Sequence, residues 1–214
     1  MRRVFAIVLM LLPLLARADG EGAVRLLDRA VAHIKSDGGV QMDFEYSAYD
    51  AGGEPLFAEK GLFYADCRLG DKGKERFALL LDELKIWCDG VQQWNYSART
   101  GEIYITAADS DEAQSLSPLH IMQLYKSGYN CSLGQEGAND VVTLLPIDDS
   151  GEFTKVMIYI NKVSLQPVRM RLFMGENGSI DIAIKSYKGG LELEDKTFVC
   201  PVNDFPNVEI VDMR

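Results

Sequence analysis

The residues most able to do chemistry in this chain are four cysteines and two histidines, and their spacing matches no metal site. Structural zinc sites use four Cys or His ligands, commonly in close pairs along the sequence. His33 and His120 fall in predicted helices, and no two cysteines form a C-x-x-C pair. We therefore predict no metal site. The cysteines are Cys67, Cys88, Cys131 and Cys200.

Motifs for catalysis are also missing from the sequence. It has no G-x-S-x-G elbow, H-E-x-x-H pair, P-loop or G-x-G-x-x-G turn. Acidic residues gather at positions 109–112 and 148–149, but without the glycine and distal glutamate of a calcium loop. We interpret these clusters as solvated loop charge. The sequence predicts a protein without enzymatic activity, catalytic residues or a cofactor.

The first 18 residues have the three parts of a secretory signal peptide. Arg2 and Arg3 form the charged start, residues 4–15 form the apolar stretch, and Ala16-Arg17-Ala18 is the cleavage signal. The apolar stretch is shorter than the roughly 20 residues that span a bilayer. We expect cleavage near Ala18, export, and a mature domain over residues 19–214.

Export and charge limit the partners and the cysteine chemistry. The chain carries 32 acidic and 22 basic residues, a formal net charge of −10, which repels nucleic acid. An oxidising compartment favours disulfides, and four cysteines allow three pairings. Buried free thiols are an equal alternative. A bridge between Cys131 and Cys200 is one pairing we consider, because it would tie the end of the sheet to its middle.

A helical pattern opens the mature chain, and alternating patterns follow. Apolar residues recur at helical spacing from Ala23 to Ile34, and Asp37-Gly38-Gly39 ends the helix. Beyond Gly39 the apolar residues mostly alternate with polar ones, as in strands with one buried face. The predicted strands are 40–46, 62–64, 77–81, 84–88, 91–96, 102–106, 141–145, 155–161, 168–173, 179–186 and 196–199.

A second helical segment interrupts the strands in the middle of the chain. Ser117 is a suitable N-cap, Pro118 suits the first helical position, and Gly128 ends the segment. A short helix over residues 109–116 is expected just before it. The apolar face of the segment consists of Leu119, Ile121, Met122 and Tyr125.

These elements predict a mainly β protein with a few helices: one antiparallel sheet of about ten to eleven strands in up-and-down order. Such a sheet must curl, and helices over its concave face are the simplest cover. Barrels of about eight strands are filled by their own side chains, whereas wider ones enclose a cavity. The side chains expected on the concave face are Phe44, Tyr46, Leu62, Tyr64, Phe77, Leu79, Leu81, Leu84, Ile86, Trp94, Val156, Ile158, Ile160, Val168, Met170, Leu172, Ile180, Ile182 and Ile184.

Short motifs in a fixed order resemble the outer-membrane lipoprotein carrier family, the LolA-type carriers. The clearest is a strand–turn–strand over residues 86–96, where Asp89-Gly90 precedes Trp94 and Tyr96. The helix before residues 40–46, the strand Gly61-Leu62-Phe63-Tyr64 and the helix starting at Pro118 also match. The resemblance continues with Leu144-Leu145-Pro146, with Phe198 and Pro201, and with Val208-Glu209-Ile210-Val211-Asp212.

The resemblance implies an unclosed antiparallel half-barrel with helices forming a lid over the apolar concave face. It implies a periplasmic carrier that holds the acyl chains of lipoproteins, or another lipid, and moves them toward the outer membrane. An inner-membrane release complex and an outer-membrane acceptor would be its partners, and we expect a monomer. The alternative is a non-catalytic envelope-stress sensor or regulatory lipid-binding subunit with the same half-barrel.

In this family an arginine after the second strand commonly bonds to the lid and keeps the empty cavity shut. The corresponding stretch here, residues 67–76, is longer and lacks the usual proline. Arg68 and Arg76 are therefore the candidates for a lid lock. The helix residues Leu119, Ile121, Met122 and Tyr125 would form the lid itself.

Overall fold

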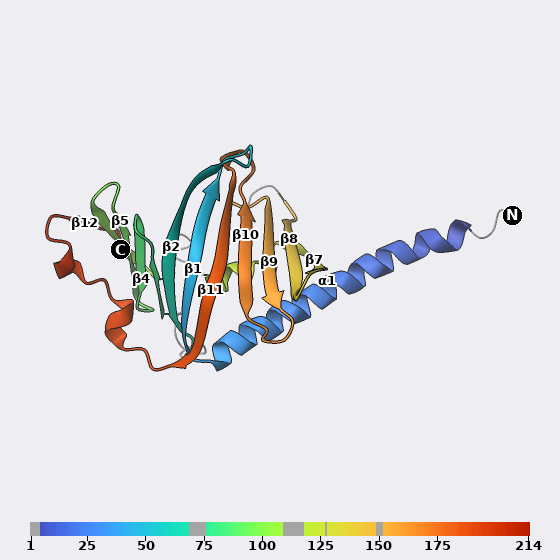
Figure 1. The fold of residues 1–214 in the computed structure, drawn as a ribbon, viewed down its shortest axis with the longest axis horizontal. Helices are drawn as coiled ribbons and strands as arrows, with labels where there is room; N and C mark the ends of the chain where they lie inside the picture. Colours follow the sequence, from blue (N-terminus) through green and yellow to red (C-terminus); the bar gives the residue numbers. More distant parts are fainter. Residues whose placement is uncertain (1–4, 69–75, 109–117, 127, 149–151) are drawn as a thin grey trace.

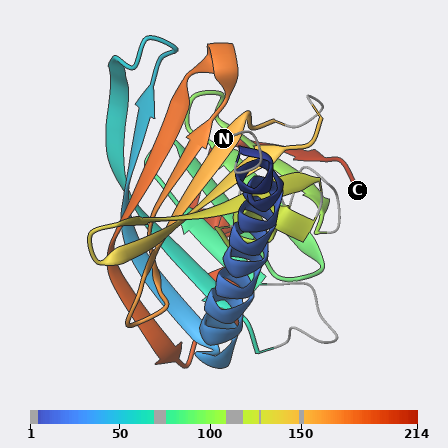
Figure 2. The same cartoon turned by 90° about the vertical axis from the view of Figure 1, so that its right-hand side faces the viewer.

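One twelve-stranded sheet curves around the N-terminal helix (Figures 1 and 2). The computed structural model describes residues 5–68, 76–108, 118–126, 128–148 and 152–214, with side chains from Gly20 onward. Helix α1 is Phe5–Ser36. The strands are β1 Gly39–Tyr49, β2 Pro55–Asp66, β3 Arg76–Leu80, β4 Leu84–Cys88, β5 Gln92–Ser97, β6 Glu102–Ala107, β7 Tyr129–Glu136, β8 Asn139–Pro146, β9 Lys155–Asn161, β10 Pro167–Phe173, β11 Ser179–Leu191 and β12 Glu209–Asp212.

Two antiparallel meanders meet at the centre of the sheet. Strands β1 to β6 lie side by side in sequence order on one half, and β11 to β7 lie side by side on the other. The long strands β1 and β11 pair with each other and join the halves. Consequently β6 and β7, consecutive strands in the described chain, end up in opposite halves of the sheet. The sheet is therefore an unclosed half-barrel, as predicted.

Helix α1 covers the concave face near the β7 edge (Figure 2). Its buried face includes Leu27, Ala30 and Ile34, each with no exposed surface. Positions 23, 27, 30 and 34 follow the helical repeat, so a single stripe meets the sheet. The helix extends from Phe5 without a break, and its N-terminal half projects away from the sheet (Figure 1). Cleavage after Ala18 would leave the half that packs on the sheet.

The segment between β6 and β7 contributes the second cover. Helix α3, Pro118–Ile121, and the short 3-10 helix η1, Leu124–Lys126, replace the single helix expected from Pro118 to Tyr125. Leu119, Ile121 and Met122 are buried against the concave face, and Tyr125 packs at the edge of the same core. The tyrosine hydroxyl donates a hydrogen bond to Asp28 of α1, which links the two covers. The expected helix over 109–116 lies outside the described residues.

The C-terminal segment crosses the convex face of the sheet. After β11 it forms three features: the 3-10 helices η3, Asp195–Phe198, and η4, Val202–Asp204, and then β12. A second apolar cluster forms beneath it, where Trp87 and Trp94 meet Phe205. Strands β3 and β4 therefore carry buried apolar residues on both faces.

Three details of the strand prediction were wrong. Residues 196–199, predicted as a strand, fall in and just after η3. Strand β12 pairs with β6 in parallel, so the sheet is mixed rather than wholly antiparallel. The bounds of strand β7 were not predicted, because five of its eight positions are polar or glycine and it lies at the edge of the sheet. The sheet has twelve strands, against the predicted ten to eleven.

The convex cluster suggests a mutation that would weaken the packing of the C-terminal segment on the sheet. The chain has two tryptophans, Trp87 and Trp94, and both lie beneath this segment. Replacing Phe205 with Ala removes a ring 6.1 Å from the Trp87 ring and 4.5 Å from the Tyr96 ring. We expect a loss of about 2 kcal/mol in the free energy of unfolding and a red shift of tryptophan emission.

The matched control is Phe153→Ala, a ring deletion in the concave cluster. It should lower stability without shifting tryptophan emission. An unshifted spectrum for Phe205→Ala would show that the C-terminal segment does not shield the two indoles.

Candidate ligand-binding cavity

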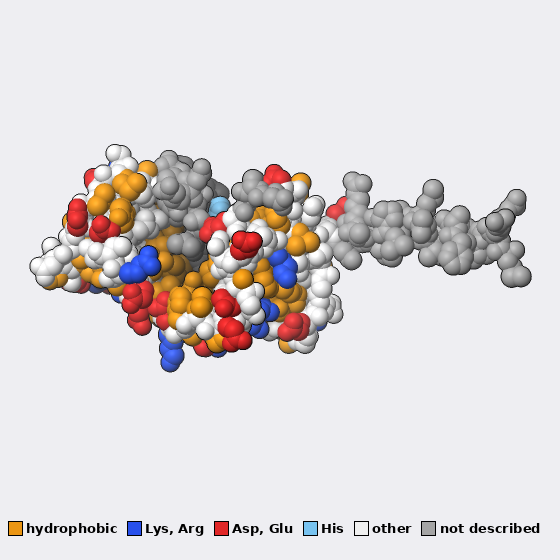
Figure 3. Space-filling view, turned by 90° about the horizontal axis from the view of Figure 1, so that it is seen from above, with side chains coloured by type: hydrophobic (Ala, Val, Ile, Leu, Met, Phe, Trp, Pro, Cys, Tyr) orange, Lys and Arg blue, Asp and Glu red, His pale blue; other side chains and the backbone are white. Residues whose placement is uncertain are grey.

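The side chains of the described residues do not fill the concave face. A cavity of about 270 Å³ remains between the centre of the sheet and the lid segment. It opens toward the end of the molecule where the β1–β2 hairpin turns, and in Figure 3 apolar side chains lie in a hollow on that face. Its lining consists of Met42, Phe44, Tyr46, Phe57, Glu59, Phe63, Leu79, Leu81, Glu83, Leu84, Ile121, Glu152, Phe153, Met170, Leu172, Ile180, Ile182 and Ile184.

Many of the residues expected on the concave face line this cavity. They come from β1, β3, β4, β10 and β11 and the turn after β3, and their side chains converge because neighbouring strands place paired residues on one face. Met170, for example, is paired with Ile182 of β11, and Leu172 with Ile180. The expected residues in the lining are Phe44, Tyr46, Leu79, Leu81, Leu84, Met170, Leu172, Ile180, Ile182 and Ile184.

A second group lies on the concave side but away from the cavity. Phe77, Ile86, Val156, Ile158 and Ile160 are buried in the core between the sheet and its covers. Their contribution is to the packing that bounds the cavity. Val168 is part of β10 and does not appear in the lining.

Three residues expected on the concave face lie on the convex one. In β2, Phe63 pairs with Leu79 and so shares the concave side, which turns Leu62 and Tyr64 outward. In β5, Trp94 pairs with Trp87 and joins the convex cluster. The error has a physical cause. In β2 both faces carry apolar residues, so the sequence gives no alternation from which to choose a side. In β5 only the face of Trp94 and Tyr96 is apolar, and the C-terminal segment buries that face on the convex side.

Several lining residues were missed by the sequence analysis. Phe57 and Phe153 reach the cavity from outside the predicted strands, and the Phe57 ring stacks on Tyr46 with centroids 5.7 Å apart. The three glutamates in the lining were also missed. A weak signal existed for Phe57, because a large apolar residue in an exposed hairpin is unusual; it is 52% exposed.

The lid residues expected from sequence divide into two roles. Ile121 lines the cavity, while Leu119 and Met122 are buried beside it in the concave core. Tyr125 faces α1, and burial together with the bond to Asp28 raises the pKa of its hydroxyl. The phenol therefore stays protonated and can donate to the Asp28 carboxylate at neutral pH.

One glycine shapes the cavity wall. The Phe44 ring lies over Gly61 of β2, where a Cβ atom would come within 2.2 Å of its Cζ and 2.8 Å of a Leu81 methyl. Contacts that short do not occur, so any side chain at this position must push the ring aside. Gly61 is the first residue of the stretch Gly61-Leu62-Phe63-Tyr64 that resembles the carrier family, and the close approach of Phe44 explains why glycine suits this position.

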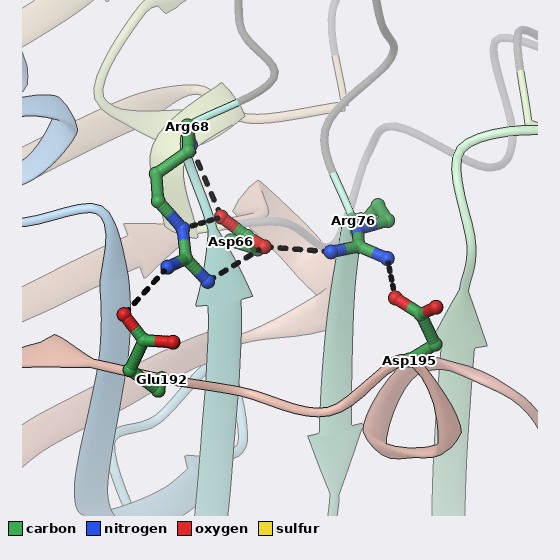
Figure 4. A network of polar contacts seen from close by, with 5 residues as sticks. All are labelled: Asp66, Arg68, Arg76, Glu192 and Asp195. Atoms are coloured by element: carbon green, nitrogen blue, oxygen red, sulfur yellow. Dashed lines mark hydrogen bonds and ion pairs between the residues drawn. The ribbon is translucent and has the colours of Figure 1, made fainter.

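The two candidate lock arginines bind elsewhere than the described lid residues (Figure 4). Arg68 donates to Asp66 from Nε at 3.0 Å and lies 3.6 Å from Glu192. Arg76 donates to Asp66 and to Asp195, both at 2.6 Å. Glu192 and Asp195 belong to the segment that crosses the convex face. These arginines therefore fasten the C-terminal segment to the ends of β2 and β3, and the contacts made by the described residues do not include the expected one to the lid.

Asp66 is the centre of this network. Its side chain is 3% exposed, and hydrogen bonds from Arg68, with a smaller contribution from Arg76, lower the pKa of the carboxyl to about 2. Burial alone would have raised it. The carboxylate is therefore charged throughout the physiological range.

The described cysteines show no bridge between Cys131 and Cys200, both of which carry free thiols. They lie in different clusters: Cys131 borders the concave core, and Cys200 lies in the convex one. Burial raises the pKa of Cys200 to about 11 and also raises that of Cys131, so both thiols stay protonated at neutral pH. Among the described side chains, no three His, Cys, Asp or Glu residues gather as metal ligands.

An open sheet folded around an apolar cavity and covered by helices defines a class of binding proteins. The family model described as "Outer membrane lipoprotein carrier protein LolA" matches residues 14–176, most of the chain. The chain belongs to this LolA family. No curated protein sequence matches it.

Solved structures share the fold at low sequence identity. MucB is 16% identical, with a TM-score of 0.50 over 91% of this chain and 66% of its own. A DUF1329 family protein from Desulfovibrio piger is 14% identical, with a TM-score of 0.49 over 86% and 98%. A LolA superfamily protein from Nitrosomonas europaea is 13% identical, with a TM-score of 0.43 over 84% and 98%. At these identities the likeness shows the fold alone.

Replacing Gly61 with Ala tests the cavity wall. The new methyl group must displace the Phe44 ring, so we expect a loss of about 1–3 kcal/mol in stability and weaker binding of an apolar probe. Chemical denaturation and probe fluorescence measure the two effects. Gly134→Ala is the matched control, because a Cβ there meets its nearest atom at 3.8 Å. Equal behaviour of the two variants would refute the tight approach at Gly61.

Replacing Asp66 with Asn tests the arginine network through its pH dependence. A carboxyl whose pKa falls from 3.8 to about 2 on folding stabilises the protein fully above about pH 4. That contribution, roughly 2 kcal/mol, declines as the pH falls further and is gone below about pH 2. The variant should lack both the contribution and this part of the pH dependence, as measured by denaturation at several pH values.

Asp212→Asn is the control for this experiment. Asp212 also binds an arginine, Arg214, but the two side chains are 50% and 45% exposed. Exposed pairs contribute little, so this variant should keep nearly the wild-type stability. If Asp66→Asn behaved in the same way, the buried network would not be what holds the C-terminal segment.

Proposed function

We propose that this protein is a non-catalytic carrier that holds an acyl chain of a lipoprotein, or of another lipid, in the concave cavity. The observation that carries the proposal is the unfilled apolar cavity in a member of the LolA family. Aliphatic and aromatic side chains form most of its lining, and such a surface gains free energy by covering another apolar surface. The lid residue Ile121 takes part in the lining, so an occupant would touch both the sheet and the lid.

The size of the cavity suits temporary holding. Each methylene removed from water gains about 0.8 kcal/mol. Three fully buried long chains would exceed the useful limit of about −20 kcal/mol for non-covalent affinity, and a carrier must also release its cargo. A cavity of about 270 Å³ lies below the usual range of roughly 300–1,000 Å³ for small-molecule sites. A cavity of this size would cover only part of an acyl chain, and incomplete cover makes release of the lipid to an acceptor easier.

The site of action proposed here is the periplasm. The sequence of residues 1–18 supports export, and cleavage near Ala18 would leave the packed half of α1 in the mature chain. Among the described residues, no helix combines the length and apolar character needed to cross a membrane. An inner-membrane release complex and an outer-membrane acceptor are the partners that membership of the family suggests.

A regulatory role is the second candidate. The likeness in fold to MucB supports it, because solved structures described as MucB in complex with MucA belong to the same structural group. In that case the main function of the protein would be to bind a protein partner rather than to transfer cargo. Native mass spectrometry of protein purified from the periplasm separates the two. Copurified lipid or acylated peptide supports the carrier, and a stoichiometric protein partner supports the regulator.

Replacing Ile182 with Asp tests the cavity as the binding site. The new carboxylate would project into the apolar lining, so binding of the neutral fluorescent probe N-phenyl-1-naphthylamine should fall at least about tenfold. Ala183→Asp adds the same charge to the next residue of β11, which faces the convex side. The control should bind the probe normally. Equal binding by both variants would place the probe outside the cavity and count against the proposal.

A further inference from the structure

The charged residues that line the apolar cavity are all acidic. Its lining includes Glu59, Glu83 and Glu152 and no lysine, arginine or histidine from the described residues. In Figure 3 acidic side chains lie beside the hollow in which the apolar side chains gather. An acidic lining is not needed to hold an alkyl chain, so it bears on the polar end of the occupant.

The three carboxylates surround the opening from separate parts of the chain. Glu59 is on β2, Glu83 is in the turn between β3 and β4, and Glu152 is in the connection between β8 and β9. They therefore approach the mouth from both halves of the sheet. All three belong to the lining of the same cavity.

Among the described residues, no basic side chain forms an ion pair with any of these three carboxylates. Within the described part of the chain, neither Glu83 nor Glu152 forms an ion pair, and both residues are exposed. Glu59 accepts a hydrogen bond of 2.9 Å from the backbone N–H of Asp82, which fixes it at the rim and leaves its charge unpaired.

Nearby groups respond to this negative field. Burial and then Glu59 raise the pKa of Tyr46, which lines the cavity. Burial and then Glu152 and Asp148 raise the pKa of Tyr129 at the start of β7. The acidic charge is thus felt on both sides of the opening.

We infer that the cavity selects an acyl chain whose polar end carries a positive charge, and discriminates against a free fatty acid or another anionic end. The inference rests on the proposed function and names the class of cargo. A cation at the mouth would be attracted to three carboxylates at the edge of an apolar wall, where water screens charge less well than in bulk. A carboxylate or phosphate in the same place would be repelled.

A series of probes with one chain length and different ends tests the inference. Dodecyltrimethylammonium, dodecanol and dodecanoate, each below its aggregation concentration, would compete with N-phenyl-1-naphthylamine for the intact protein. We expect the cation to bind roughly tenfold more tightly than the carboxylate at about 10 mM salt, with dodecanol between them. The difference should shrink at about 1 M salt, where the Debye length is near 3 Å.

The double variant E83Q/E152Q removes two mouth charges and keeps the shape of both side chains. It should lose most of the discrimination between the cation and the carboxylate. The control E136Q/E209Q makes the same change in net charge at exposed positions of β7 and β12, away from the lining. It should discriminate as the wild type does.

The outcomes separate this inference from the proposed function. Binding of dodecanol with equal affinity for the two charged probes would leave the carrier standing and overturn the charge selectivity. Equal loss of discrimination in both double variants would assign it to the net charge of the protein, which also overturns the inference. If dodecanol fails to bind, the proposed function fails, and the selectivity falls with it.

Discussion

The structure depends on one constraint: among the described strands, the two edge strands β12 and β7 do not pair with each other, so the sheet does not close. A curved sheet with an open side exposes backbone donors and acceptors at its edges and an apolar concave face. Here β12 covers the edge at β6, α1 packs beside β7, and α1 with the lid segment covers the face. Helices cannot match a concave surface as closely as strands pair, and a cavity remains between them.

The sequence predicted the features that follow from the spacing of apolar residues and from the order of the family motifs along the chain. The helix of the mature chain, most strand positions, the buried lid residues and the unclosed half-barrel all came from apolar spacing, turn residues and family motifs. Several cavity residues were also predicted, notably Met170, Leu172 and Ile182, which alternate with polar neighbours and so identify one face. Where one face of a strand is exposed to solvent, the alternation of polar and apolar residues alone identifies the buried face.

The remaining part could not be predicted because it depends on contacts between distant segments. Leu62, Tyr64 and Trp94 were assigned to the wrong face because the C-terminal segment buries apolar residues on the convex side. In β2 both faces are therefore apolar, and in β5 the one apolar face is the convex one. The same segment accounts for the arginines. Arg76 binds Asp195, which lies 119 positions later in the chain, and no local sequence pattern predicts such a pairing. A family motif located the arginine-bearing stretch, but the partner depended on the path of the chain after β11.

Proteins that share this fold at low sequence identity need the same apolar surfaces, but they do not need the same residue at each position of those surfaces. An identity of 16% to MucB is compatible with the same sheet because many apolar side chains can line a concave face. Gly61 is a stricter case, since the Phe44 ring occupies the space of a side chain there. The mouth is the least constrained part, because exposed carboxylates such as Glu83 and Glu152 contribute little to stability. Charge at the mouth can therefore change between relatives without cost to the fold, and it is where proteins with one scaffold would come to differ in cargo.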